Sequence, residues 1–334
     1  MKTLKSITIV SALILAFGFN LELDAQDAHY TQFDASPVML NPATTGVFDN
    51  SDWRASARFR SQWGSLGTNF LTTSVAFDMP FKDRIGIGGY FQNYDMASTI
   101  NVTNLVGSGS YEITEPGNGD YRLTAGLQLG FMIKSLNMNS MIFDNQYDEG
   151  LFNEDLPTGE IFERGAKFSP DVNLGMFYQM TDESKEFIPW GSLSLFHAVP
   201  TKDVFISNVK ARVPLRWMFS GGGTWQADEK LKILPSLLYM KQRADWQVDV
   251  NVLGQYHVEE TEYDVIGGFS WRSSDAIAFH AGVHHRENIF RISYDFNVSS
   301  LNEFTRSRGA IEFSLLYYGF NSVKKKLPEN TEEY

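Results

Sequence analysis

Cysteine is absent from the 334 residues of this chain. Without a thiol there is no disulfide framework, no thiolate metal ligand, no cysteine nucleophile and no lipid anchor on an N-terminal cysteine. Long apolar runs are also scarce. After residue 25 no segment approaches the roughly 20 consecutive apolar residues that a transmembrane helix needs. Any part of this chain that spans a membrane must therefore cross it with strands.

The short motifs that mark common catalytic sites are missing as well. The sequence has no G-x-S-x-G nucleophile elbow, no G-x-x-x-x-G-K-[ST] phosphate loop and no H-E-x-x-H zinc motif. A lipase acting at the lipid boundary would need a serine, a histidine and an orienting polar group, and no spacing selects them. We therefore predict a protein that is not an enzyme and uses no cofactor.

Positive charge is in deficit. The chain has 28 Lys and Arg against 40 Asp and Glu, which gives a net charge of -12. Nucleic-acid binding in general requires a basic surface, so we predict no nucleic-acid partner.

Three histidines come nearest to a metal-binding pattern. In a strand register His280 and His284 face the same side, with His285 opposite. Same-face residues four apart on a strand are roughly 13 Å apart, so these two could share a metal only with ligands from neighbouring strands. We predict no metal site.

The N-terminus has the pattern of a secretory signal peptide. Lys2 and Lys5 precede a largely apolar run over residues 7–19, which Ser11 interrupts, and the small residue Ala25 follows. The run is too short for a membrane anchor. We predict that residues 1–25 are a signal peptide cleaved near Ala25, which routes the chain out of the cytoplasm.

The most prominent feature that is present is a set of long, two-faced strands. Between positions 121 and 134 every odd position is apolar or aromatic, while the even positions include Arg122, Gln128 and Lys134. The same alternation returns over residues 290–297. Successive side chains of a strand point to opposite faces, so each segment has one apolar and one polar face. Strands of this length and pattern are typical of a membrane barrel.

Period-2 segments between turn signals give fourteen candidate strands, an even number, as a bacterial single-chain barrel requires. We predict an all-β fold, a transmembrane antiparallel β-barrel of about fourteen strands (range twelve to sixteen) over residues 51–320. The candidate strands are 52–62, 69–79, 84–96, 100–114, 119–134, 169–180, 187–198, 212–225, 231–243, 246–257, 263–272, 275–285, 288–298 and 308–319.

Loop lengths predict the orientation, since outer-membrane barrels place long loops outside and short turns in the periplasm. The long gaps 135–169 and 199–211 follow odd-numbered strands, whereas the turn-like segments 80–83, 115–118 and 286–287 follow even-numbered ones. We therefore expect the N-terminus of the barrel on the periplasmic side. Residues 321–334 are predicted to be a solvated, charged C-terminal tail.

The polar face of the predicted strands carries charges of both signs. A fourteen-stranded barrel leaves room for a plug or a narrow channel. We expect these charges to pair across the lumen, where opposite charges offset each other's desolvation. The predicted lumen-facing residues are Arg54, Arg58, Arg60, Arg122, Gln128, Lys134, Asp249, Arg291, Asp295 and Glu312.

Residues 26–50 are predicted to form an N-terminal periplasmic strap or plug, with a merely anchored N-terminus as the alternative. Ser36 can cap a helical turn that has Pro37 at its first position, and Pro42 disfavours its continuation, so residues 38–40 would form a compact apolar patch. The side chains predicted to bind a partner or to fill the barrel are Tyr30, Gln32, Phe33, Leu40, Asn41 and Pro42.

At these residues the sequence resembles the PorP/SprF family of outer-membrane proteins, which is associated with type IX secretion and gliding in Bacteroidetes. The resemblance spans nearly the whole chain after the signal peptide. The residues that carry it are 29–33 (His-Tyr-Thr-Gln-Phe), 40–43 (Leu-Asn-Pro-Ala), Gly46, 59–63 (Phe-Arg-Ser-Gln-Trp), 234–239 (Leu-Pro-Ser-Leu-Leu-Tyr), 293–295 (Ser-Tyr-Asp) and 299–301 (Ser-Ser-Leu).

The resemblance implies a non-enzymatic barrel of the bacterial outer membrane that supports type IX secretion and the surface retention of a large adhesin, with gliding motility as one outcome. The implied partners are the secreted adhesin, periplasmic lipoproteins of the secretion machine, and outer-membrane lipid. We expect external loops, above all 135–169, and the lumen to contact the adhesin, while the periplasmic turns and the N-terminal strap face the machine. The alternative is an uptake channel for a small solute, which the same barrel could serve.

Overall fold

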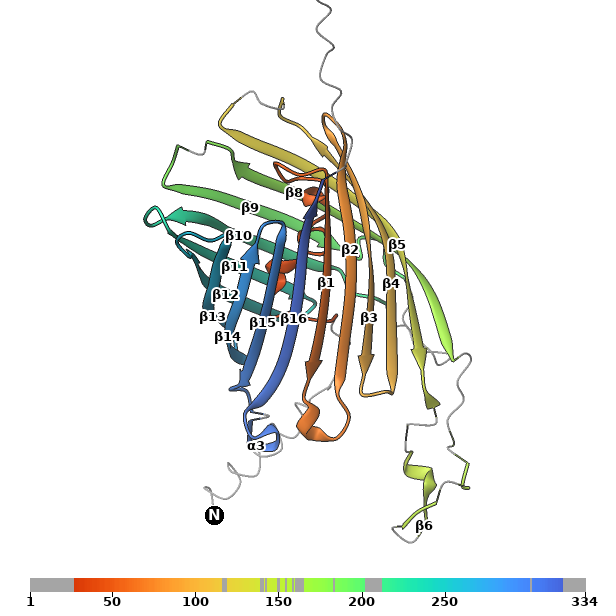
Figure 1. The fold of residues 1–334 in the computed structure, drawn as a ribbon. Coiled ribbons are helices and arrows are strands. Elements are labelled where there is room, and N and C mark those ends of the chain that lie inside the picture. Colours follow the sequence, from red (N-terminus) through yellow and green to blue (C-terminus); the bar gives the residue numbers. More distant parts are fainter. Residues whose placement is uncertain are drawn as a thin grey trace, which may run out of the picture.

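The computed structural model describes residues 27–115, 119–138, 141, 143–148, 151–153, 155–157, 159, 165–182, 184–201, 212–300 and 302–320. In this part of the chain fourteen strands close into one antiparallel barrel, which confirms the predicted fold class (Figure 1). The predicted signal peptide, residues 1–25, and the predicted tail, residues 321–334, lie outside the described residues. None of the helices in the described ranges is long and apolar enough to cross a membrane.

Each barrel strand pairs with the barrel strands before and after it in the sequence, and the first strand pairs with the last. The barrel strands are β1 (Trp53–Gln62), β2 (Phe70–Lys82), β3 (Ile85–Met96), β4 (Ile100–Glu112), β5 (Tyr121–Leu136), β8 (Ala166–Met180), β9 (Phe187–Phe196), β10 (Arg216–Gln226), β11 (Leu231–Gln242), β12 (Asp245–His257), β13 (Tyr263–Arg272), β14 (Ala276–His285), β15 (Asn288–Asn297) and β16 (Arg308–Gly319).

The observed strand ends differ from the predicted ones in a few places, each with a local cause. β2 continues to Lys82, through the predicted turn at Pro80. β1 pairs with β2 only as far as Asp78, so the end of β2 has one partner, and a proline with no N–H is tolerated there beside a register shift. β10 starts at Arg216 rather than at position 212, because Pro214 cannot donate to a ladder.

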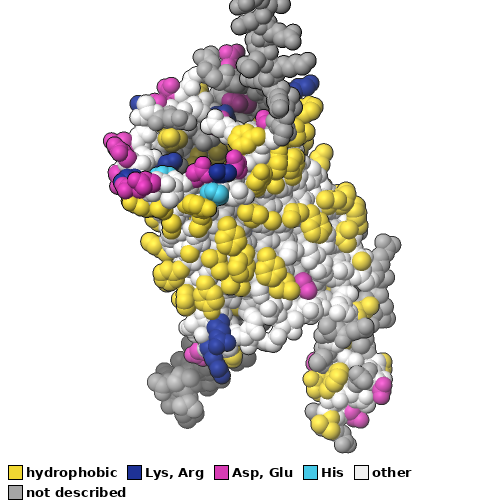
Figure 2. Space-filling model, in the orientation of Figure 1, with side chains coloured by type: hydrophobic (Ala, Val, Ile, Leu, Met, Phe, Trp, Pro, Cys, Tyr) yellow, Lys and Arg dark blue, Asp and Glu magenta, His cyan; other side chains and the backbone are white. Residues whose placement is uncertain are grey.

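The outer surface of the barrel is apolar. Leu127, Leu129 and Phe131 of β5 are 44%, 58% and 38% exposed, while Gln128 between them is fully buried toward the lumen. Figure 2 shows a band of hydrophobic side chains across the visible face, with charged side chains gathered at the upper rim. Exposed Trp217 and Trp225 lie near opposite ends of β10. An apolar band flanked by aromatic residues is the surface that a transmembrane barrel presents to lipid.

The two ends of the barrel differ in their connections. The longest connection, residues 137–165 between β5 and β8, carries η5 (Asp144–Gln146) and a two-stranded sheet of β6 (Tyr147–Asp148) and β7 (Leu151–Phe152). It projects from the same end as η3 (Gly64–Leu66) and α3 (Asn302–Thr305) (Figure 1). We call this end the loop end, and the opposite end, where β1 begins and β16 ends, the turn end. The long connections follow odd-numbered strands in barrel order, in agreement with the gaps between the candidate strands in the sequence.

The chain's own N-terminal segment lies inside the barrel. Residues 27–50, called the plug from here on, contain η1 (Phe33–Ala35), α2 (Pro37–Leu40) and η2 (Pro42–Thr44), drawn in red within the barrel in Figure 1. At the loop end Asp27 forms an ion pair with Arg216, and at the turn end Asp49 forms one with Arg122. The plug therefore runs the length of the lumen rather than across one mouth of the barrel, as a strap would.

The helical turn in the plug has only part of the predicted capping. Pro37 does occupy the first turn of α2, and the helix ends before Pro42. The Ser36 side chain, however, makes no capping bond. Its hydroxyl lies 2.8 Å from the Ser56 hydroxyl of β1, so the bond to the barrel wall replaces the cap.

The apolar side chains of α2 do not form one patch, contrary to the prediction. Val38 packs against one side of the wall and Leu40 against another, because the turn sits inside a closed barrel and has wall around it. Val38 packs with Ala76, Tyr90 and Val106, and Leu40 with Phe33, Phe196, Met218, Leu238 and Met240.

Candidate functional site

Thr31 of the plug lies at the centre of a buried cluster of charges, called here the Thr31 cluster: Thr31, Arg60, Arg272, Asp295 and Glu312. The Thr31 hydroxyl lies 2.8 Å from both carboxylate oxygens of Asp295 and accepts bonds of 2.6 Å from Arg60 and from Arg272. Its backbone N–H donates to Glu312 at 2.8 Å. The four charged residues come from β1, β13, β15 and β16, and each is at most 5% exposed.

The charges of the Thr31 cluster also pair directly with one another. Arg60 lies 2.9 Å from Asp295 and 3.2 Å from Glu312, and Arg272 lies 3.4 Å from Asp295. Buried ions are costly unless their charges are paired and their remaining hydrogen-bonding groups are used. Thr31 completes this network, which joins the plug to four strands of the wall.

Gln32 extends the contact next to Thr31. Its side-chain amide donates to the Ser293 hydroxyl and to the backbone oxygen of Glu312, both at 3.1 Å, and its oxygen accepts from Ser314. Its backbone N–H donates to the Glu312 carboxylate at 3.1 Å. Gln32 is fully buried, so every one of these groups would be left unsatisfied if the plug moved.

Asn41 fixes the middle of the plug to the opposite wall. Its side-chain amide donates to the backbone oxygens of Met176 in β8 and Leu193 in β9, each at 3.0 Å. Two inward-facing glycines make room for it: a Cβ on Gly175 would lie 2.0 Å from the Asn41 side chain, and one on Gly126 would lie 2.3 Å from Pro42. The wall is thus hollowed where the plug crosses it.

At the turn end the wall holds the plug through Arg54 and Asp78. The two side chains form an ion pair of 2.7 Å. Arg54 also donates to the Thr44 backbone oxygen at 3.0 Å, and Asp78 accepts from the Gly46 N–H at 2.6 Å. The Arg54–Asp78 ion pair therefore also holds the plug, through the backbone of Thr44 and Gly46.

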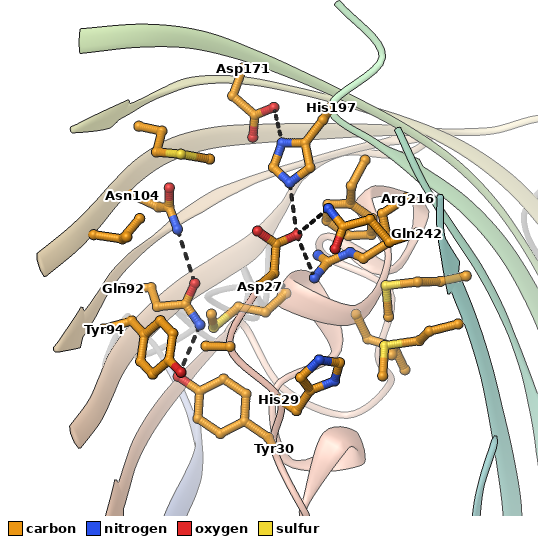
Figure 3. Close-up of a pocket in the computed structure, with 18 of the residues that line it drawn as sticks. Asp27, His29, Tyr30, Gln92, Tyr94, Asn104, Asp171, His197, Arg216 and Gln242 are labelled. Carbon is orange, nitrogen blue, oxygen red and sulfur yellow. Dashed lines mark hydrogen bonds and ion pairs between the residues drawn. The ribbon is translucent and has the colours of Figure 1, made fainter. Parts of the chain in front are cut away.

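Asp27 anchors the loop end of the plug, in a group called here the Asp27 latch: Asp27, Asp171, His197 and Arg216 (Figure 3). The Asp27 carboxylate lies 2.9 Å from both Arg216 and His197, and the second ring nitrogen of His197 lies 2.8 Å from Asp171. Burial disfavours the charged ring, but the two carboxylates outweigh it and raise the pKa of His197 to about 9. His197 is therefore a cation at neutral pH.

The predicted lumen-facing residues all lie on the inner side of the wall, but they pair with one another only in part. The structure brings Arg60, Asp295 and Glu312 together. Others meet the plug instead: Arg291 pairs with Asp34 at 2.8 Å. Three of the rest form ion pairs: Arg54 with Asp78, Arg122 with Asp49 and Glu112, and Asp249 with Arg272. Arg58 lies over the Tyr30 ring, Gln128 donates to the Val38 backbone oxygen, and Lys134 lines a cavity.

The plug side chains singled out from the sequence all lie against the wall, and each is buried. They are Tyr30, Gln32, Phe33, Leu40, Asn41 and Pro42. Tyr30 lies under Arg58, whose guanidinium carbon is 3.6 Å from the centre of the ring. These residues bind the chain's own barrel, so in this state they are not available to an external partner.

Several residues of the site were missed by sequence reasoning. Asp78 points to the same face of β2 as the buried Ser74, and Arg272 to the same face of β13 as the buried Ser270. The alternation of polar and apolar residues along these strands could therefore have predicted that both face the lumen. Asp27 and His197 lie outside the strands, where no period applies.

The three histidines near the C-terminus are not brought together. The His280 ring lies 2.9 Å from the Ser270 hydroxyl inside the barrel, whereas His284 lies 3.2 Å from Asp264 toward the turn end. Within the described ranges no group of three or more His, Asp or Glu side chains is arranged to hold a metal ion.

The chain matches the model of a known protein family over most of its length. The model of the family "Type IX secretion system membrane protein PorP/SprF" matches residues 22–317. The chain belongs to this family. This PorP/SprF barrel is accordingly an outer-membrane protein of the type IX secretion system. A search of curated proteins finds no match.

Solved structures with a similar fold are also outer-membrane barrels. The TodX monoaromatic hydrocarbon channel, in a deltaS2 mutant, is 8% identical, with 86% of this chain and 94% of that chain covered and a TM-score of 0.50. A Pseudomonas aeruginosa FadL homologue is 11% identical, with 84% and 93% covered and a TM-score of 0.47. At these identities the likeness concerns the fold alone.

Proposed function

We propose that this PorP/SprF barrel is a non-enzymatic component of type IX secretion that holds a large secreted adhesin at the cell surface. The observation that carries the proposal is the plug. A lumen crossed from the loop end to the turn end by a segment bonded to the wall at Thr31, Asn41 and Thr44 is suited to a rigid holder rather than to an open pore. Where the adhesin drives movement, gliding motility is the outcome.

The surface proposed to contact the adhesin is the sheet of β6 and β7 in the longest connection. Its side chains Tyr147, Leu151 and Phe152 are 50%, 75% and 47% exposed, and the sheet projects beyond the rim of the barrel (Figures 1 and 2). Exposed apolar side chains mark interaction sites, and a two-stranded sheet has free edges to which an extended segment can add. By loop parity this end faces outside, and the turn end faces the periplasmic lipoproteins of the machine.

The test is affinity purification of the tagged protein from outer membranes of its host, followed by mass spectrometry. We expect one very large adhesin together with lipoproteins of the secretion machine. Leu151→Ser with Phe152→Ser should abolish recovery of the adhesin, while Asp148→Ser, an exposed residue of the same sheet, should not. Recovery of the adhesin at wild-type level with the double variant, with the barrel folded, would contradict the loop surface.

An uptake channel for a small solute is the second candidate, and a cavity between plug and wall near the loop end favours it. Conductance in a planar bilayer separates the two functions. The proposed holder is silent with its plug in place, whereas a channel passes ions or solute without any change to the protein.

A further inference from the structure

A cavity of about 90 Å³ lies between the loop-end half of the plug and the barrel wall. One side of it is apolar and rich in methionine and aromatic side chains, and a second apolar group comes from β4, β5 and the segment just before β10. Methionine and aromatic surfaces adapt to small apolar ligands. The first group is Phe33, Leu40, Phe196, Met218, Leu238 and Met240, and the second includes Val102, Met132 and Val213.

Three buried polar groups around this cavity have hydrogen-bonding atoms with no partner in the protein. They are both ring nitrogens of His29, the side-chain oxygen of Asn104, and Nε of Arg216. Figure 3 shows the His29 ring with no bond drawn to it, while its neighbours are bonded. More than nine in ten buried polar groups of native proteins are paired. Their meeting at a single cavity points to a ligand that pairs with them.

The charge around the cavity favours an anion. Arg58, Arg216 and the protonated His197 line it, against the two carboxylates of Asp27 and Asp171. His29 adds no charge, because burial and the nearby arginines Arg272 and Arg216 lower its pKa to about 4. A neutral imidazole has one donor and one acceptor, so it can donate to a carboxylate without a counter-charge.

We propose that the cavity binds a small amphiphilic carboxylate, with its head group at Arg216 and His29 and its short carbon chain against the apolar side. Arg216 already pairs with Asp27 through Nη1, and its Nε remains as the donor for the ligand. A cavity of about 150 Å³ holds benzene, so this smaller one suits a chain of a few carbons and excludes sugars. The site goes beyond the proposed role in secretion and stands without it.

The test uses the intact protein, plug included, in lipid nanodiscs, and measures propanoate binding by ¹³C NMR of the labelled carboxyl group. We expect a single saturable site, with propanol and propylamine binding at least tenfold more weakly. Arg216→Gln and His29→Phe should each weaken propanoate binding at least tenfold. Arg122→Gln removes the same charge at the turn end, away from the cavity, and should leave propanoate affinity unchanged.

Three outcomes would overturn the proposal: no saturable propanoate binding above that of empty nanodiscs, propanol binding as tightly as propanoate, or Arg216→Gln and His29→Phe both retaining full affinity. The comparison of propanoate with propanol needs only the unaltered protein, so it decides the matter even if a variant fails to fold. Val213→Trp, which fills the cavity without removing a charge, should also abolish binding.

Discussion

At the scale of single residues, one hydroxyl organises a large share of the buried charge. Thr31 is the only member of the Thr31 cluster that the plug contributes, and its side chain contacts two arginines and an aspartate at once. Removing one partner from a buried polar network leaves the others with their desolvation cost uncompensated. The contribution of Thr31 to the free energy of folding therefore depends on the buried charged groups that it bonds.

Thr31→Val keeps the shape of the side chain and removes the hydroxyl. We expect the free energy of unfolding to fall by about 1–3 kcal/mol, because Arg60, Arg272 and Asp295 each lose a hydrogen-bond partner. Urea unfolding in detergent micelles measures it. Thr31→Ser retains the hydroxyl and should stay close to the unaltered protein. A large loss in Thr31→Ser with little loss in Thr31→Val, which retains the methyl group, would show that packing of the methyl group matters more than the hydroxyl bonds.

The Asp27 latch predicts loosening of the plug at alkaline pH. His197 has a pKa of about 9 in the folded protein against about 6.5 in an unfolded chain. The folded state therefore binds the proton more tightly, and the stability it adds is full below pH 6.5 and lost as the pH rises from 6.5 through 9. Hydrogen exchange of residues 27–33, corrected for intrinsic rates, should show protection falling over that window.

The matched variant for the latch is His197→Asn. His197 has a backbone φ of 58°, a left-handed conformation that asparagine tolerates better than most residues. The variant has no titrating ring, so protection of residues 27–33 should be lower at pH 7 and nearly independent of pH between 6.5 and 9. A pH dependence that survives in this variant would assign the effect to another group.

At the scale of elements, the glycines of the wall decide where the plug can lie. Gly126→Val places a branched side chain where the backbone of Pro42 and Ala43 now sits, with the first added carbon 2.3 Å from both. We expect the plug to be displaced and the barrel to conduct ions in a planar bilayer. Gly191→Val is the control, because a Cβ on Gly191 meets nothing within 4 Å. A silent Gly126→Val barrel would mean that the plug can shift and still close the lumen.

The strands were predictable from the sequence to within a few residues, and the contacts of the plug were not. β13 and β16 have the predicted bounds, since lipid on one side and polar groups on the other impose a period of two on every strand. The bonds from Thr31 and Gln32 reach Asp295 and Glu312, more than 260 positions away, and no periodicity connects them. The sequence predicted a strap or plug over residues 26–50, with a merely anchored N-terminus as the alternative, but which wall the segment would meet depended on barrel closure.

At the scale of the whole molecule, the barrel and the plug form one closed body. Deleting residues 27–48 removes the contacts at Thr31, Asn41 and Arg54 together, and each of them leaves a buried wall group unpaired. We expect the deleted barrel to conduct steadily and to unfold at a lower urea concentration, while the intact barrel is silent. An intact barrel that conducts as well as the deleted one would reassign this protein to the channel class.

The contacts of Thr31 and Gln32 also bear on how the barrel is built. β1 and β16 are the two ends of the sheet, and their pairing, Arg60 opposite Glu312, is what turns an open sheet into a cylinder. Those same two side chains hold Thr31. Thr31 therefore bridges the two strands whose pairing closes the cylinder, so the bonds that hold the plug also fasten the seam of the barrel.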